Sequence, residues 1–538
     1  MATTTSRGVS NAASDPGLRR ALGFWHLTGI ALGGILGSGW LLTPMYAAQE
    51  AGPAALLTWV IAGLALVPMA LVLVELGASY PMSGGLVRWP FHSSGRLVGT
   101  FASWCIWLAY ATNPPGEATA AIAYLRPHWP WLYSGSSLAP WGYLLGLGLM
   151  GAFVLLNWFG VRLFARFNLL ITIGKIAVPT VTALALLAAH FDRHNLTGHG
   201  GLAPNGYPVA LTAITTAGAV FAFTGFQAPL DFAGEATGQR RDIPRAVATA
   251  LLGSLALYVV LQLAFLGAIP HANLAHGWSS GVNQQSTYLY LAKALNLFWL
   301  SMLLSVDAVG SPAGSALVYT AEGSRAAYAM GLPHYGLLPQ RIGAVHTRSG
   351  IPRNALAVNF VLSACFLVFL RDWPHIIAVT SILTLLGYSM SLVSAQAIRR
   401  SGRQMARLVP GVALLAPVSF TVTALIFYWS GWDRLHYVLL ALAVATAVGY
   451  SWHAWEHRRD GFDWRDLLHG LWLVGYLAAM TAMSKLGSFH GAGVIAAPYD
   501  SILVAAIALL SYVGGLGGAE RHLRRRGTQR YLDGVGPG

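Results

Sequence analysis

The feature that most constrains this chain is a succession of apolar segments, each long enough to cross a bilayer. A transmembrane helix needs about 20 mainly apolar residues. Fourteen segments meet this requirement, and the links between them are short or contain proline. They lie near residues 23–47, 54–79, 97–124, 140–158, 167–190, 209–235, 244–269, 288–320, 354–371, 375–398, 408–429, 435–453, 467–486 and 496–517. The sequence therefore predicts an all-α integral membrane protein with about 14 transmembrane helices and no soluble domain between them.

The composition agrees with a membrane protein and argues against other classes. Of the 538 residues, 55% are hydrophobic and only 10% are charged, which is far from the composition of soluble globular domains. The net charge is +14, but the basic residues are scattered over short loops, so no nucleic-acid partner is predicted. Cys105 and Cys365 both lie inside apolar runs, and each is predicted to be a buried thiol without a disulfide partner.

Lysine and arginine are distributed unevenly between alternate loops, and this distribution predicts the orientation of the chain. With the N-terminus in the cytosol, 26 of the 33 Lys and Arg residues fall on the cytosolic side and five on the outer side. Such an excess is typical of cytosolic loops. We therefore predict a multi-pass protein of the plasma or inner membrane with both termini in the cytosol. Residues 1–20 are predicted to be a disordered tail, and residues 519–538 a basic tail.

Glycines interrupt the first apolar segment at residues 33–39, which read Gly-Gly-Ile-Leu-Gly-Ser-Gly. Glycine destabilises a helix, and lipid cannot satisfy the backbone groups that a broken helix exposes. The free N–H groups where the helix restarts can hold an anion, and the free carbonyls before the break can hold a cation. An amino acid carries both charges, so the break predicts a zwitterion site. The alternative is that these glycines only allow neighbouring helices to approach closely.

A second interruption lies in the sixth apolar segment, where residues 221–226 read Phe-Ala-Phe-Thr-Gly-Phe. Gly225 and the nearby Pro229 remove helical regularity at mid-depth. Segments one and six begin two five-helix halves of the pattern. Interrupted segments at corresponding positions indicate a transporter site at the interface of inverted repeats.

Three ionisable residues in apolar segments are candidates for function, because a charge inside the membrane is costly and is a functional candidate by default. Burial penalises the charged form of Lys175, so this lysine can take and release a proton. The alternative for Lys175 is a side chain that reaches the membrane interface. Asp307 precedes two serines at helical spacing, and Glu117 follows a kinked Asn-Pro-Pro-Gly run. Each carboxyl group is a candidate for a proton or a substrate amine, or else it satisfies neighbouring backbone groups.

The other charged residues suggest structural roles. Glu75 and Glu235 lie near cytosolic ends and are predicted to bind backbone N–H groups or loop arginines. Lys293 is predicted to extend to the outer interface from the end of the eighth segment. Histidines such as His271 lie mostly in loops or at segment ends, without the spacing of a metal motif. No nucleotide-binding fingerprint is present, so we predict no cofactor, no metal, no catalytic residue and no ATP-driven transport.

Three motifs resemble those of the amino acid–polyamine–organocation superfamily. They are residues 33–39; residues 221–226 with Gly234-Glu235 and Asp242-Ile243-Pro244-Arg245; and Glu75-Leu76-Gly77-Ala78 with Pro81 and Gly84-Gly85. Segments such as Gly37-Ser38-Gly39-Trp40-Leu41, Tyr428-Trp429-Ser430-Gly431-Trp432 and Gly487-Ser488-Phe489 resemble, more specifically, the aspartate–proton symporter branch. The resemblance runs through nearly the whole chain. It implies a leucine-transporter-type 5+5 inverted-repeat core at 21–400 and four additional helices at 401–518.

The resemblance also implies a place for Lys175. In proton-coupled members of the superfamily, a lysine in this fifth-helix context stands where sodium-coupled relatives bind a cation. This match implies that Lys175 lies against the first-helix break and the eighth segment. An acidic substrate such as aspartate is implied only by the branch resemblance.

Together these observations predict a secondary active transporter, not an enzyme, that imports an amino acid with a proton through the lipid bilayer. The predicted substrate-binding residues are Gly37, Ser38 and Gly39 for the carboxylate, the carbonyls of Ile35, Phe221 and Thr224 for the amine, and Phe221 or Phe223 as an aromatic lid. The predicted proton-coupling residues are Lys175, Asp307 and Glu117. An amino acid exchanger of the same fold is one alternative, and a non-transporting sensor or channel is another.

Overall fold

The structure is a computed structural model of the 538-residue chain. It describes residues 21–126, 128–134, 137–159, 161–283, 286–347, 349–402, 405, 408–456 and 464–525, and of residues 161–170 and 239 it describes only the backbone. The predicted tail at 1–20 and residues 526–538 of the predicted basic tail lie outside this range. Residues 519–525 belong to the last helix instead of a tail.

The described chain is almost entirely helical. The long helices are α3 (Ala55–Ser79), α4 (Gly85–Leu125), α5 (Pro140–Trp158), α6 (Val161–Ala189), α11 (Gln239–Ala268), α14 (Phe298–Met330), α15 (Arg353–Leu370), α16 (Trp373–Arg400), α17 (Val412–Trp429), α18 (Trp432–Glu456), α19 (Trp464–Leu486) and α20 (Tyr499–Arg525). The shorter helices are α1 (Phe24–Ile35), α2 (Ser38–Ala51), α7 (His194–Thr197), α8 (Tyr207–Thr216), α9 (Ala219–Phe223), α10 (Ala228–Asp231), α12 (Trp278–Gly281) and α13 (Tyr288–Ala294).

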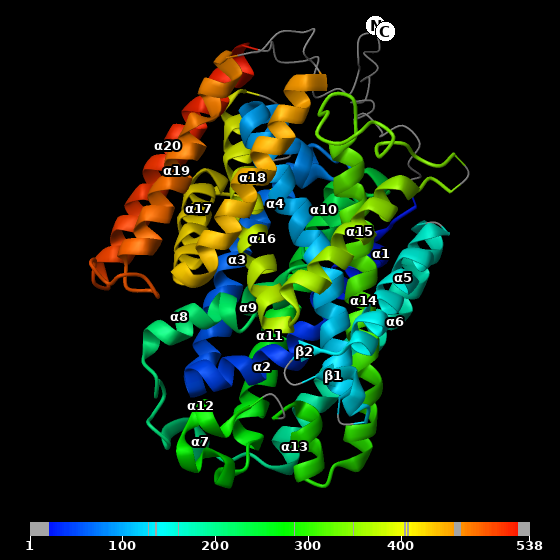
Figure 1. Cartoon of the computed structure of the whole chain (residues 1–538), viewed down its shortest axis with the longest axis vertical. Coiled ribbons are helices and arrows are strands. Elements are labelled where there is room, and N and C mark those ends of the chain that lie inside the picture. The colour runs from blue at the N-terminus through cyan, green and yellow to red at the C-terminus, as the bar shows by residue number, and fades with distance from the viewer. Residues whose placement is uncertain are drawn as a thin grey trace, which may run out of the picture.

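Short elements fill some of the links. The 3₁₀ turns are η1 (Gly52–Ala54), η2 (Pro130–Leu132), η3 (Ala233–Glu235) and η4 (His271–His276). Strands β1 (Tyr133–Ser134) and β2 (Ser137–Leu138) form one antiparallel pair, with Tyr133 opposite Leu138. Figure 1 shows the long helices side by side, with α7, α12 and α13 gathered at the lower end of the view.

Among the described residues, 11 helical stretches are long and apolar enough to cross a membrane. The chain is therefore an all-helical, multi-pass membrane protein. One of these stretches, Phe24–Ser79, contains two of the predicted segments. Two further predicted segments fall in α4 and in the short helices α8–α10. The number of fourteen spans remains a prediction.

The helices are arranged as a buried inner group and an outer group. Along its most apolar part α16 is 94% buried, whereas α5, α15 and α18 are only 28% buried. The inner helix α16 packs along α4. Ser389 Oγ of α16 donates to Leu385 O of the same helix at 2.8 Å, and Ser394 Oγ accepts from Ser93 Oγ of α4 at 2.8 Å. Small residues such as these serines allow membrane helices to pack closely.

Both predicted interruptions are confirmed. Helix α1 ends at Ile35 and α2 begins at Ser38, with two non-helical residues between them. Helix α9 ends at Phe223, and the following Gly225 has a positive φ of 116°. A Cβ atom on Gly225 would lie 2.4 Å from the carbonyl carbon of Gly34. The two breaks are therefore in direct backbone contact, and only glycine fits there.

The eighth apolar segment was placed about ten residues too early. The prediction of one span at 288–320 is wrong, because α13 ends at Ala294, Asn296 adopts a positive φ of 58°, and α14 begins at Phe298. Lys293 therefore belongs to the short helix α13. Helix α14 continues to Met330 through charged residues because those residues are buried and paired. Arg325 Nε, for example, donates to Glu235 Oε1 at 2.7 Å.

Two further predictions from the sequence can be compared with the structure. Cys105 is buried as predicted, but Cys365 is exposed on the outer helix α15. An apolar run fits lipid and protein surroundings equally well, so the sequence could not decide which of them Cys365 faces. The structural role predicted for Glu75 is confirmed, because its carboxylate accepts from Arg399 Nη1 at 2.7 Å and from the backbone N–H of Val409 at 3.2 Å.

Candidate functional site

The carbonyl groups at the end of α1 are engaged by side chains from three other helices. The pairs are Lys175 Nζ with Gly33 O at 2.5 Å, Ser315 Oγ with Gly34 O at 2.9 Å, and Tyr258 OH with Ile35 O at 2.9 Å. These side chains belong to α6, α14 and α11. The break in α1 therefore creates a group of acceptors that holds one cation and two hydroxyl groups deep in the helix bundle.

Lys175 lies against the α1 break and α14, as the resemblance of the chain to proton-coupled members of the superfamily implies. Its side chain is 1% exposed, touches the α1 break through Gly33 O, and packs beside Gly314 of α14. A lysine at this depth bonded to a carbonyl dipole is not one that reaches the interface. Asp307, on the same face of α14, accepts from Ser311 Oγ at 2.7 Å. Within the described part of the chain, neither Asp307 nor Glu117 forms an ion pair with Lys175.

Glu117 occupies the N-terminus of α2. Its Oε2 accepts from the backbone N–H of Ser38 at 2.7 Å. A Cβ atom on Gly37 would lie 2.2 Å from Oε1, so glycine is needed there for the carboxyl group to approach. Partial positive charge at a helix N-terminus favours a carboxylate. The position predicted for a substrate carboxylate is therefore filled by a carboxyl group of the protein itself in this conformation.

The second break is joined to α14 by a polar chain. Gly225 N–H donates to Gln227 Oε1 at 2.7 Å, and Gln227 Nε2 donates to Glu322 Oε1 at 3.2 Å. The predicted amine ligand Phe221 O already accepts from Thr224 Oγ1 at 2.6 Å. Sequence reasoning missed Glu322 because it ended the eighth segment at residue 320. The carboxylate and Arg325 lie in a run whose other residues are mostly small or apolar, and this pattern was the signal that could have found Glu322.

The two predicted lid residues have different surroundings. Phe223 packs edge-on against Trp59 and Tyr258, with ring centroids 5.7 and 5.2 Å away. Phe221 instead meets the edge of Trp373 at 6.0 Å. Trp373, which sequence reasoning missed, also donates from Nε1 to Ser38 Oγ at 2.8 Å. Phe221 and Trp373 therefore lie together beside the α2 N-terminus, and Phe223 belongs to the packing of α3 against α11.

Gly39 fits the packing alternative better than a ligand contact. A Cβ atom at this position would lie 2.7 Å from both Cα and Cβ of Ala222 in α9. The glycine therefore allows α2 to pack directly on α9, as small residues do between membrane helices. Among the predicted carboxylate ligands, Ser38 is the one whose N–H meets a carboxylate in the structure.

A cavity of about 470 Å³ opens on the far side of Trp373. We call it the vestibule. It is lined by Leu42, Met45, Tyr46, Thr119, Ala123, Tyr124, Arg126, Pro130, Tyr133, Thr287, Leu289, Tyr290, Lys293, Arg371, Asp372, Trp373 and Pro374. Three of its lining residues are basic and one is acidic. Trp373 stacks on Tyr46 of α2 with centroids 5.3 Å apart and also reaches Ser38, so Trp373 connects the vestibule wall with the start of α2.

Residues 22–456 match the family described as amino acid permease. The chain belongs to this family. It is a membrane transporter of amino acids and not an enzyme, and the resemblance to the amino acid–polyamine–organocation superfamily is confirmed. The permease is 38% identical to the glutamate/serine transporter AimA of Bacillus subtilis, over 93% of this chain and 94% of that relative. It is 33% identical to the aspartate–proton symporter of the same organism, over 92% of this chain and 95% of that relative.

More distant relatives differ in their named substrates. The branched-chain amino acid permease BcaP of Bacillus subtilis is 24% identical over 84% of this chain and 96% of that relative. The cationic amino acid transporter 4 of Homo sapiens is 26% identical over 73% of this chain and 61% of that relative. Family membership therefore gives amino acid transport, whereas the choice of amino acid depends on the site.

Proposed function

We propose that this permease is a symporter that carries an amino acid and a proton together into the cell. The observation that carries the proposal is the Lys175 ammonium bound to Gly33 O at the α1 break. A buried lysine whose environment changes when the break rearranges would change its proton affinity between two conformations. Such a difference couples proton movement to the transport cycle. The name of one relative, an aspartate–proton symporter, supports the same coupling.

We propose acidic amino acids as the substrate class. The vestibule carries Arg126, Lys293 and Arg371 against the single acid Asp372. An excess of positive charge in a cleft raises the local concentration of anions and their rate of entry. Both of the more similar relatives have an acidic amino acid in their names. In the cycle we propose, a substrate carboxylate replaces Glu117 at the Ser38 N–H, and carbonyls of the two breaks hold the amine.

We propose that the chain spans the plasma or inner membrane fourteen times with both termini in the cytosol. The two broken segments, α1–α2 and α8–α10, would be the first helices of two inverted five-helix repeats, followed by four additional helices. The direct contact between Gly34 and Gly225 supports this pairing. The vestibule would then open to the outside, since α13 lies at the end predicted to be outer.

The test is uptake by purified permease in proteoliposomes. Radiolabelled L-aspartate, L-glutamate, L-serine and L-leucine are compared with and without an inward proton gradient. We expect gradient-dependent accumulation of aspartate or glutamate. Uptake that needs an amino acid inside the vesicle and ignores the gradient would identify an exchanger instead. No uptake of any amino acid under either condition would refute the transport proposal for this permease.

A further inference from the structure

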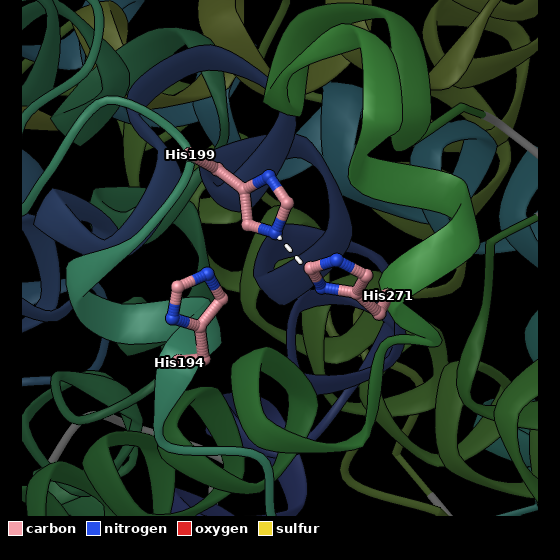
Figure 2. A group of neighbouring side chains, drawn as sticks. All are labelled: His194, His199 and His271. Carbon is pink, nitrogen blue, oxygen red and sulfur yellow. Dashed lines mark hydrogen bonds between the residues drawn. The ribbon is translucent and has the colours of Figure 1, made fainter.

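Three histidines from two separate links come together, near the end of the molecule where α7, α12 and α13 lie (Figure 1). His194 begins α7, His199 follows in the same link between α6 and α8, and His271 begins η4 after α11. Each offers a ring nitrogen, and these nitrogens all lie within 4.8 Å of one another. Figure 2 shows the three rings turned toward a common space.

We propose that His194, His199 and His271 form a binding site for a divalent transition metal ion such as Zn²⁺. Three imidazole nitrogens with an open position for water are a donor set that suits Zn²⁺ and its neighbours in the first transition row. The sequence predicted no metal site because this spacing matches no metal motif. The third ligand comes from a different link, 72 positions after His199.

The geometry is close to that of a bound ion. His199 Nε2 and His271 Nδ1 are hydrogen-bonded to each other at 3.2 Å, and a bound ion would replace the proton between them. Two nitrogens that coordinate one tetrahedral Zn²⁺ at its usual bond length are roughly 3.3 Å apart. The His194 ring lies 5.5 and 5.6 Å, centroid to centroid, from the other two rings. A small rotation of this exposed ring therefore completes the set.

The backbone around the cluster is held in place before any ion binds. Asn195, next to His194, is buried and donates to Leu266 O at 3.0 Å and Ile269 O at 2.9 Å. This amide joins the α7 link to the end of α11 and to Ile269, two residues before His271. Gly198 makes room for the His194 ring, since a Cβ atom there would lie 2.5 Å from Nε2. Ligands on fixed elements lose little freedom when they bind.

A second group of possible ligands, Asp466, His469 and His522, is a weaker candidate. Asp466 Oδ2 accepts from the backbone N–H of Arg96 at 2.9 Å, and Oδ1 pairs with His522 Nδ1 at 2.9 Å. Both carboxylate oxygens are therefore already engaged in joining α19 and α20 to α4, and two of the three residues are buried. This group is best explained as a structural contact, and it serves as an internal comparison.

A bound ion would connect two parts of the permease that the proposed cycle uses. The α7 link leads into α8 and the second break. The η4 segment bonds to the vestibule wall, since Asn273 Nδ2 donates to Tyr290 OH at 3.1 Å. An ion held by both segments would restrain their relative movement.

The experiment is a calorimetric titration of Zn²⁺ into the full-length permease in detergent, with any polyhistidine tag removed. We expect one site per chain. His271→Ala and His199→Asn should each weaken binding by about 100-fold or more, because loss of an outer-shell partner alone costs about 10–100-fold. Asparagine is chosen at position 199 because φ is +47° there, a conformation that asparagine tolerates. His128→Ala, which removes an exposed histidine outside the cluster, should bind Zn²⁺ like the unmodified protein.

A thermal unfolding measurement provides a second readout. Zn²⁺ should raise the midpoint of the unmodified permease and of His128→Ala, because an ion that binds only the folded state stabilises it. It should not raise the midpoint of His199→Asn or His271→Ala, whose midpoints without metal should match the unmodified protein. Unchanged Zn²⁺ affinity in these two variants, or loss of binding in His469→Ala instead, would overturn the proposal. These readouts do not depend on transport, so they test the metal site separately from the proposed symport.

Discussion

The replacement of Lys175 by methionine tests the coupling mechanism most directly. Methionine keeps most of the volume of the buried side chain, so packing against α1 and α14 changes little. It removes the ammonium and with it the hydrogen bond to Gly33 O. A hydrogen bond with a charged partner is worth about 1.5–3 kcal/mol. We therefore expect a folded protein of somewhat altered stability that has lost its only cation at the α1 break among the described residues.

The size of the expected effect follows from the proton gradient. One pH unit corresponds to about 1.4 kcal/mol per proton, or about a tenfold concentration ratio. A single coupling lysine predicts one proton per cycle. Proteoliposomes with an inward gradient of one pH unit and no membrane potential should then concentrate L-aspartate up to about tenfold with the unmodified protein. With Lys175→Met the ratio should fall to about one, while exchange of aspartate across the membrane continues.

The matched control is Lys485→Met, which removes an exposed lysine at the end of α19. It should accumulate aspartate like the unmodified protein. Accumulation by Lys175→Met that still follows the gradient would refute the reasoning, and Asp307 or Glu117 would become the leading coupling candidate. If Lys175→Met loses both exchange and accumulation, Lys175 is needed for the substrate site as well as for coupling.

Three further predictions concern other parts of the site. Gly39→Val should clash with Ala222 and lower the free energy of unfolding by about 1–3 kcal/mol, which a reduced thermal midpoint would show. The control is Gly148→Val, because no atom lies within 4 Å of a Cβ at that position, and equal midpoints for the two variants would contradict tight packing at Gly39. Glu117→Gln should bind aspartate about fivefold more tightly in equilibrium binding, because a neutral amide competes less well for the α2 N-terminus by about 1 kcal/mol. Weaker binding would show that the Glu117 carboxyl group helps to bind the substrate. Arg371→Gln should slow entry of aspartate more than entry of serine, with the difference shrinking at high salt; equal effects on both would refute steering by the vestibule.

The sequence by itself determined the class of the protein and the positions of both helix breaks. Runs of apolar residues indicated a multi-pass, helical membrane protein, because the bilayer accepts only such runs. Glycine at 33–39 and at Gly225 marked the interruptions, because the cost of glycine in a helix is a local property. Lys175 was recognisable from the apolar residues on either side of it in the sequence. These inferences need only neighbours along the chain.

The tertiary structure decided which groups meet. Tyr258 and Trp373 reach the first break from helices more than 200 positions away, and no local pattern marks them. Glu322 became a site residue because α14 continues beyond the predicted end and its carboxyl group meets Gln227 of the second break. Gly39 packs against Ala222, a contact that no local pattern marks. Contacts between distant segments depend on how whole helices pack, and that arrangement is set by many surfaces together.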